Sequence, residues 1–150
     1  MKRIDNERIF VVAEALRRGI EPEEINRITR IDLFFIYKIQ NIIKMERRLL
    51  KEGLTEDTLK AAKRIQMPDE AIAHFAEVTV KEVENFKKKL AFHPDFKMVD
   101  TCAAEFEAHT PYYYSTYGAE DEVKPQGKGS VVVFGSGPIR IGQGIEFDYC

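Results

Sequence analysis

Apolar residues recur every three or four positions through residues 4–90, which is the spacing of one buried face of an α-helix. In the first periodic segment this face consists of Ile9, Val12, Ala13 and Leu16. Asp5 or Asn6 can cap the start of the helix by accepting backbone N–H groups, and Gly19 can adopt the left-handed conformation that ends it. The pattern therefore predicts a helix over residues 4–20.

Residues 32–53 form the longest periodic segment, with Asp32 as the predicted N-cap and Gly53 as the predicted stop. Two adjacent rows of apolar side chains run along it. The first row contains Ile36, Ile39, Ile43 and Leu50, and the second contains Phe35, Ile42, Met45 and Leu49. Together they make a stripe wider than a surface helix needs. We therefore expect either that this is the central helix of a small bundle or that another subunit covers one row.

The remaining periodic segments are shorter, and each begins with a helix-start signal. Pro22 opens one helix and Thr55 caps another without a complete capping box, whereas Thr79 and Glu82 form a complete box. A break at residues 77–79 divides the last segment into two helices. No strand pattern occurs before residue 95, so residues 1–92 are predicted to form an all-α domain of about six helices.

Residues 93–128 lack a sustained period and are predicted to connect two domains. Four tyrosines fall within residues 112–117. Their rings can stack on nucleic-acid bases, but few positive charges lie nearby to bind a phosphate backbone. We therefore expect these rings to pack against a neighbouring domain.

Residues 129–150 have the pattern of a buried strand followed by a glycine-rich turn. Val131–Phe134 is a continuous apolar run, typical of a parallel strand covered on both faces. The turn matches neither common nucleotide-binding motif, because Arg140 replaces the third glycine of the dinucleotide fingerprint and no Gly-Lys-Ser/Thr follows. A parallel partner strand needs a crossover of a dozen or more residues, and only six residues follow Gly144. We expect this segment to begin an α/β domain.

Composition is typical of a globular protein and argues against metal-binding, membrane-spanning and nucleic-acid-binding roles. The 150 residues are 44% hydrophobic and 32% charged, with a formal net charge of −2. The two cysteines and three scattered histidines lack the spacing of a metal site, and no apolar run has the length of a membrane span. We therefore expect a cytoplasmic protein with no metal site, no membrane partner and no nucleic-acid partner.

A helix-turn-helix is the alternative interpretation of residues 72–90, with Val80–Leu90 as the recognition helix. Four lysines on this helix would supply the positive charge that DNA binding requires. However, Glu82 and Glu84 offset that charge, and the helix contains no arginine. A nucleic-acid-binding domain therefore stays the second function class.

Three stretches are similar to the large subunit of carbamoyl-phosphate synthetase. They are INRITRIDLFFIYKIQNIIKMERRLL, VDTCAAEFEAHTPYYYSTY and GSGPIRIGQGIEFDYC. The resemblance implies a mostly α fold with a helical oligomerisation domain over residues 1–92 and a connector over residues 93–128. Residues 129–150 would then be the first strand and glycine loop of the α/β pre-ATP-grasp domain that opens the second synthetase half.

The same resemblance implies a parent ligase that makes carbamoyl phosphate from bicarbonate, ammonia released from glutamine, and two ATP, for pyrimidine and arginine biosynthesis. Its ATP-grasp domains would bind ATP with Mg²⁺ or Mn²⁺ outside residues 1–150, so we expect no cofactor, no catalytic residue and no activity in these residues alone. The implied partners are a second copy of the chain, the remainder of the large subunit and a glutaminase small subunit. The chain is expected to be either an excerpt of the large subunit or the start of the second half of a naturally split one.

In this family the glycine loop faces the internal route that carries carbamate between the two sites. The matching candidates are Gly135, Gly137, Arg140, Gly142, Gly144 and Glu146. Gly144 would leave room for a small anion, and Glu146 would order water or handle protons. Turn geometry for Gly144 and a position near a helix N-terminus for Glu146 explain the same residues equally well.

Self-association is expected to involve the second apolar row of residues 32–53. Its candidate interface residues are Phe35, Ile42, Met45 and Leu49. Because the sequence does not orient a helix about its axis, the first row can take this role instead.

Overall fold

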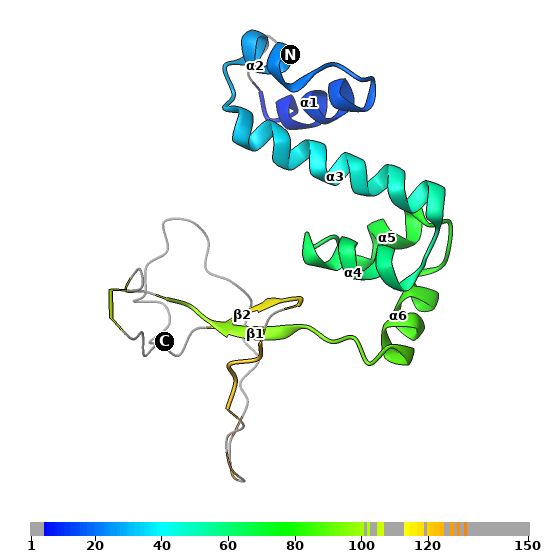
Figure 1. The fold of residues 1–150 in the computed structure, drawn as a ribbon, viewed down its shortest axis with the longest axis vertical. Coiled ribbons are helices and arrows are strands. Elements are labelled where there is room, and N and C mark those ends of the chain that lie inside the picture. Colours follow the sequence, from blue (N-terminus) through cyan, green and yellow to red (C-terminus); the bar gives the residue numbers. More distant parts are fainter. Residues whose placement is uncertain are drawn as a thin grey trace.

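The computed structural model describes residues 5–100, 113–118 and 120–124, together with positions 102, 105, 106, 127, 129 and 131. Six helices come first in the described residues, as the periodicity predicts, and a two-stranded antiparallel sheet follows (Figure 1). The helices are α1 (Arg8–Arg17), α2 (Pro22–Thr29), α3 (Leu33–Glu52), α4 (Glu56–Arg64), α5 (Asp69–Phe75) and α6 (Val80–Lys89). The strands are β1 (Asp95–Met98) and β2 (Tyr113–Thr116).

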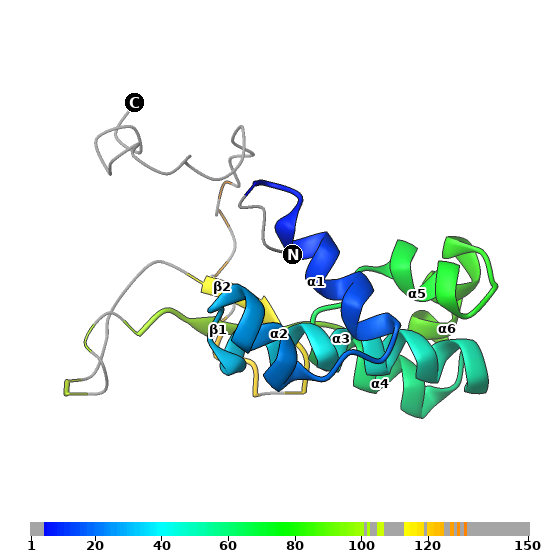
Figure 2. The ribbon, with the colours of Figure 1, turned by 90° about the horizontal axis from the view of Figure 1, so that it is seen from above.

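The helices bury two separate hydrophobic cores, and among the described helices only α3 contributes to both. Figures 1 and 2 show α3 running from α1 and α2 to α4, α5 and α6. We call α1, α2 and the first half of α3 the N-terminal lobe. Its core consists of Val12, Ala15, Leu16, Ile25, Ile36 and Ile43. We call the second half of α3 with α4, α5 and α6 the C-terminal lobe. Its core consists of Met45, Leu49, Leu59, Ala62, Met67, Ile72, Ala73 and Val83.

The two apolar rows of α3 are explained by these two cores. Ile36 and Ile43 of the first row are buried in the N-terminal lobe, whereas Met45 and Leu49 of the second row are buried in the C-terminal lobe. The two lobes therefore cover faces of α3 that lie about two fifths of a turn apart, given 3.6 residues per turn. The expectation of a central helix is correct, and much of the wide stripe is covered by the chain itself.

Several helix ends follow the capping signals of the sequence. The Asp32 carboxylate accepts a hydrogen bond from the Phe34 backbone N–H at 2.8 Å, and Gly53 ends α3 with a φ of 68°. Thr79 and Glu82 form the reciprocal capping box that starts α6. These contacts satisfy backbone groups that the first and last turns of a helix leave without partners.

Two predicted helix starts differ from the structure. The first helix begins at Arg8, with Glu7 at the N-cap position and no side-chain cap. The Asp5 carboxylate accepts the Glu7 N–H at 3.1 Å, so this bond is made before the helix starts. Thr55 does form a complete capping box, because the Thr58 hydroxyl accepts the Thr55 N–H at 2.8 Å. The third helical position of a capping box is usually Glu or Gln, and Thr58 makes the same contact here.

The connector contains the antiparallel β1–β2 pair, which its lack of periodicity did not predict. Asp95 pairs with Thr116, and Met98 pairs with Tyr113. Glu122 lies beside β1 as well, since its N–H donates to the Phe96 carbonyl at 2.9 Å and its carboxylate accepts from the Met98 N–H at 2.7 Å. The described part of the connector is thus held mainly by backbone pairing.

Candidate functional site

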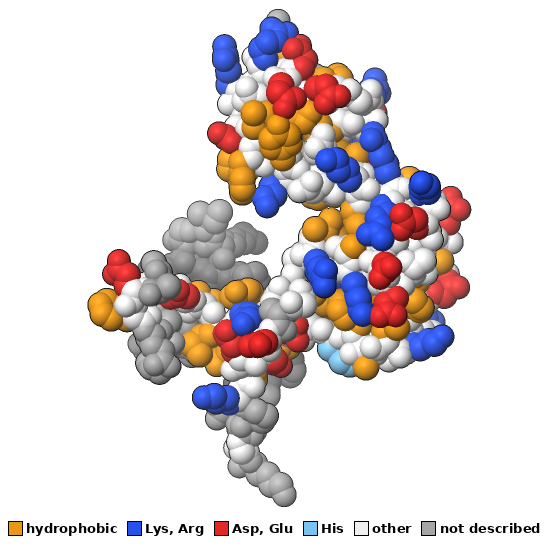
Figure 3. Space-filling model, viewed as in Figure 1, with side chains coloured by type: hydrophobic (Ala, Val, Ile, Leu, Met, Phe, Trp, Pro, Cys, Tyr) orange, Lys and Arg blue, Asp and Glu red, His pale blue; other side chains and the backbone are white. Residues whose placement is uncertain are grey.

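Large apolar side chains are exposed on one part of the N-terminal lobe, over α1 and the start of α3 (Figure 3). We call this set the α1–α3 apolar surface. It consists of Ile9, Phe10, Val11, Phe34 and Phe35. Phe10 is 65% exposed, although an aromatic ring of this size normally contributes a large buried area. Large apolar side chains exposed together on neighbouring elements mark interaction sites more often than isolated ones do.

The helical phase of α1 explains why these side chains face outward. Val12, Ala15 and Leu16 direct one face of α1 into the N-terminal core, so the neighbouring positions Phe10 and Val11 must lie on other faces. Ile9 was predicted to share the core face, but it is 56% exposed. It lies at the edge of that face and lines a hollow together with Phe35.

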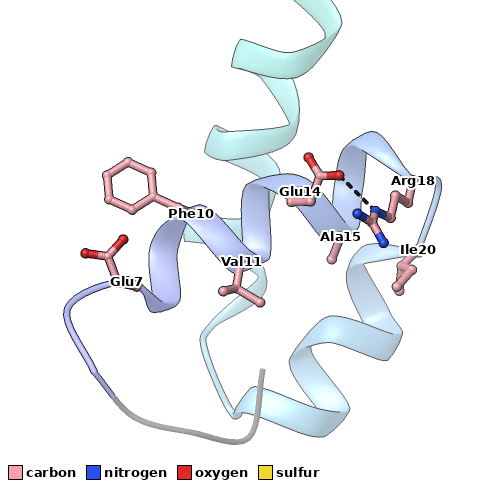
Figure 4. Close-up of a pocket in the computed structure, with 7 residues that line it drawn as sticks. All are labelled: Glu7, Phe10, Val11, Glu14, Ala15, Arg18 and Ile20. Atoms are coloured by element: carbon pink, nitrogen blue, oxygen red, sulfur yellow. Dashed lines mark hydrogen bonds and ion pairs between the residues drawn. The ribbon is translucent and has the colours of Figure 1, made fainter.

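Two hollows flank α1 and border the apolar surface. One has a volume of about 520 Å³ and is lined by Glu7, Phe10, Val11, Glu14, Ala15, Arg18 and Ile20. In Figure 4 the Phe10 ring projects outward beside Glu7, and the Glu14–Arg18 ion pair lies at the far end of the hollow. The other hollow, about 380 Å³, lies between α1 and α3 and is lined in part by Ile9, Phe35 and Ile39.

Charged groups lie at both ends of the exposed face of α1. Glu7 precedes the first residue of the helix, and Arg18 follows its last residue. Arg18 Nε donates to Glu14 Oε1 at 2.8 Å, and both side chains remain substantially exposed. The exposed face of α1 thus begins with an acid at Glu7, continues with Phe10 and Val11, and ends with the Glu14–Arg18 ion pair.

The α1 helix is fixed to the middle of α3 by charged hydrogen bonds. Arg17 donates from Nε and Nη2 to both carboxylate oxygens of Glu46, at 2.9 and 2.8 Å. The hydrogen bond to Glu46 raises the pKa of Arg17 further above its ordinary value. Arg47 Nη2 donates to the Arg17 carbonyl at 2.8 Å, which satisfies the C-terminal end of α1. The apolar surface therefore lies on a well-anchored helix.

The C-terminal lobe carries a buried charge cluster instead of an exposed apolar surface. Lys63 donates to Asp69 at 2.7 Å and to the Met67 carbonyl at 3.0 Å, and Lys87 also pairs with Asp69. Burial acts to raise the pKa of Asp69, but the hydrogen bonds from the two lysines outweigh it and lower that pKa below its ordinary value. Lys87 is one of the cations that would bind phosphate if α6 were a DNA-recognition helix. Its ion pair with Asp69 makes it less available for that role.

The connector packs against this cluster through one of its tyrosines. The Tyr117 ring lies 5.1 Å from the Phe92 ring, centroid to centroid, and Lys63 Nζ lies 5.2 Å from the Tyr117 centroid. A lysine over an aromatic face gains electrostatic attraction from the ring. Tyr117 thus packs as expected for the rings of residues 112–117, whereas Tyr113 and Tyr114 are exposed and do not. Tyr112 lies outside the described residues.

The structure separates the four interface candidates of α3 into two pairs. Phe35 and Ile42 are exposed, at 59% and 44%, and are therefore accessible to a partner. Met45 and Leu49 are buried in the C-terminal core, so a partner cannot reach them while the lobe stays folded. We therefore remove Met45 and Leu49 from the candidate interface. The same apolar row is exposed near the start of α3 and is covered by the C-terminal lobe near its end.

The glycine-loop candidates from Gly135 to Glu146 lie outside the described residues. Among the residues that the structure describes, no group of acidic, histidine or cysteine side chains is arranged to hold a metal ion. Within the same residues no helix combines the length and apolar character needed to cross a membrane.

The sequence pattern did not predict that α1 and Phe34 contribute to the apolar surface. Three consecutive apolar residues at positions 9–11 could have indicated the α1 contribution, since one helix face cannot bury all three.

Two family models match the chain. Residues 1–91 match the carbamoyl-phosphate synthetase large chain, oligomerisation domain. Residues 127–150 match the carbamoyl phosphate synthase preATP-grasp domain.

Curated relatives match nearly the whole chain under one description, carbamoyl phosphate synthase large chain. The protein from Lachnoclostridium phytofermentans is 58% identical over 149 residues, which is 98% of this chain and 14% of the relative. The proteins from Agathobacter rectalis and Methanothrix thermoacetophila are each 53% identical, over 98% and 97% of this chain. The chain spans only 14%, 14% and 13% of the length of these three relatives.

Proposed function

The chain belongs to the carbamoyl-phosphate synthetase large-chain family, and from that premise we propose that its helical part associates with a second copy of itself. The observation that carries this proposal is the α1–α3 apolar surface. It is exposed, and it is borne by a helix anchored through Arg17 and Glu46. Among the described residues of the C-terminal lobe, the large apolar side chains that are exposed are fewer, Leu50 and Ile65. Exposed Phe35 and Ile42 extend the surface along α3.

The size of the surface is suited to weak association. Burying a large aliphatic or aromatic side chain contributes roughly 1.5–3 kcal/mol. Because all five residues of the surface are already partly buried, each contributes less than this on association. The loss of translational and rotational freedom on association opposes the dimer by about 4–15 kcal/mol. The expected result for this chain alone is a dimer that dissociates in the micromolar range.

The second proposed role is to join this helical domain to the second synthetase half. The β1–β2 pair and the Tyr117 contact hold the connector near α4 and α6. Residues 129–150 would then continue into the α/β domain whose glycine loop contains the carbamate-route candidates Gly135–Glu146. The remainder of the large subunit and a glutaminase small subunit are the proposed further partners.

For the whole enzyme we propose the ligase reaction that the family implies, in which bicarbonate, ammonia and two ATP yield carbamoyl phosphate in the cytoplasm for pyrimidine and arginine synthesis. ATP and its Mg²⁺ or Mn²⁺ would bind outside residues 1–150. The proposed contribution of this chain to that reaction is assembly, and the isolated chain is expected to turn over no ATP.

Sedimentation velocity over a range of concentrations tests the self-association proposal. The unmodified chain should sediment faster as its concentration rises, and Phe10→Asp should remain a monomer because it places a charge in the apolar surface. Ile65→Asp is the matched control, since Ile65 is an exposed apolar residue of the C-terminal lobe, at 41%. It should associate like the unmodified chain. A monomer at high micromolar concentration for the unmodified chain, or equal weakening by both substitutions, would overturn the proposal.

A further inference from the structure

We propose that two copies of this chain pair through their α1 helices, antiparallel, about a two-fold axis level with the middle of α1. The inference rests on the proposed self-association and specifies its geometry. In this arrangement Glu7 of one copy lies opposite Arg18 of the partner subunit, and Phe10 and Val11 lie near the axis. The observations that carry it are the order of charges along α1, the exposure of Phe10 and Val11, and the hollow beside them.

The charge order of α1 selects the antiparallel direction. Its exposed face begins at Glu7 and ends at Arg18. Two parallel copies would place Glu7 against Glu7 and Arg18 against Arg18, which repel. Antiparallel copies place each acid opposite a base at both ends, and the helix dipoles favour the same direction. A two-fold pair is self-complementary by construction, so one chain can supply both halves of each ion pair.

The spacing along α1 places the apolar residues together in the same register. With Glu7 level with Arg18 of the partner subunit, the axis passes between positions 12 and 13. Given a rise of 1.5 Å per residue, the two Val11 side chains are then offset by about 4.5 Å along the axis and the two Phe10 rings by about 7.5 Å. The Val11 offset allows direct contact between the two valines, whereas the Phe10 rings lie beyond the roughly 4.5–7 Å of a ring pair and cover the sides of the contact. Glu14 is as close to the axis as Val11, and its charge is balanced by Arg18 of its own copy.

The surroundings of α1 leave room for a second helix. Val11, Ala15 and Ile20 line one side of the hollow of about 520 Å³ that runs along this face, and the Phe10 ring borders it (Figure 4). The Glu14–Arg18 pair is exposed, so Arg18 can also reach a carboxylate of the partner subunit. An interface built on one helix pair is smaller than the roughly 800 Å² per partner of a standard complex, which agrees with weak association.

Disulfide cross-linking tests the register directly. Cys102 and Cys150 are first replaced by serine, and Glu7→Cys and Arg18→Cys are then made as separate variants of the 150-residue chain. Mixing the two variants under mild oxidation should give at least about tenfold more cross-linked dimer than either variant alone. The mixed pair places Cys at positions 7 and 18 of opposite copies at one end and keeps the native Glu7–Arg18 pair at the other.

The single variants are the internal control. Two copies of position 7 are separated by about 16 Å along an antiparallel pair, because eleven residues rise 1.5 Å each, and a disulfide requires Cα atoms within about 7 Å. Efficient cross-linking of Glu7→Cys alone would show a parallel pair and overturn the inference. So would a lack of cross-linking in the mixture while the unmodified chain still dimerises, which would leave the proposed function intact. A monomeric unmodified chain would instead contradict the proposed function itself.

Discussion

The two lobes share α3 and are built from similar short helices, yet they differ in which apolar side chains they leave in water. In the C-terminal lobe, α4 and α5 pack against the end of α3, α6 packs against α5, and the connector adds Tyr117 over Lys63. In the N-terminal lobe, two short helices cover only one face of α3, and α1 presents Phe10 and Val11 outward. On the proposed function, a second copy covers the apolar side chains that the first lobe leaves in water, whereas the described residues of the second lobe leave fewer such side chains exposed.

The same difference is visible within α3, where successive residues have opposite environments. Leu49 is fully buried and its neighbour Leu50 is 59% exposed, because only one face of the last turns meets the C-terminal core. In the first half of α3, Ile36 is buried and its neighbour Phe35 is exposed. A hydrophobic residue on α3 is therefore buried or exposed according to whether its own face of the helix meets one of the two cores.

The largest effect is expected from truncating the buried member of the leucine pair. Leu49→Ala should lower the free energy of unfolding by about 2–5 kcal/mol, because it removes packed methyl groups and leaves a cavity. Leu50→Ala should change it by no more than about 0.5 kcal/mol, since its side chain is mostly in water. Urea denaturation followed by circular dichroism measures both. Equal losses for the two variants would mean that α3 does not pack as described.

An intermediate effect is expected from the anchor of α1 on α3. Arg17→Met leaves the buried Glu46 carboxylate without its bidentate partner, and should lower the free energy of unfolding by about 1–2 kcal/mol. This is less than the 3–5 kcal/mol of a fully buried pair, because Arg17 is partly in water. Arg18→Met is the matched control and should cost less than about 0.5 kcal/mol, since its pair with Glu14 is exposed. A similar loss for both variants would remove the distinction between anchor and surface pair.

A smaller effect is expected from pH in the C-terminal lobe. The pKa of Asp69 is lowered in the folded chain, so its carboxylate stabilises the fold above its ordinary pKa of 3.8, and that contribution is lost as the pH falls further through the folded value. Asp69→Asn removes this dependence. The difference in unfolding free energy between the unmodified chain and Asp69→Asn should be less than about 1 kcal/mol near neutral pH and should shrink below pH 3.8. A difference that grows with acidification would contradict the lysine pairing.

The sequence predicts the helical lobes well, because their signals are local. The caps at Asp32, Gly53 and Thr79 depend on backbone groups within one turn, and the 3.6-residue period requires no knowledge of neighbours. The β1–β2 pair was not predicted, because its two strands are 14 residues apart and short enough to lack a clear alternation. Pairing across that distance depends on contacts that no local pattern records.

The candidate site was only half predictable for a related reason. Periodicity identifies which residues of α3 are apolar, but it does not tell where a second core begins. Met45 and Leu49 were therefore placed in the interface row together with Phe35 and Ile42, although the C-terminal lobe covers them. The exposed residues of α1 were missed because Ile9 was assigned to the core face and its neighbours were not considered.

The central claim is that a second copy covers the N-terminal lobe and leaves the C-terminal lobe in water. Hydroxyl-radical footprinting of the chain at low and high micromolar concentration tests this most directly, since it reports the exposure of individual side chains. Labelling of Phe10 and Val11 should fall as the concentration rises, whereas labelling of Ile65 should stay constant. If Phe10 labels equally at both concentrations, or Ile65 becomes protected to the same degree, the two lobes do not differ as the account requires.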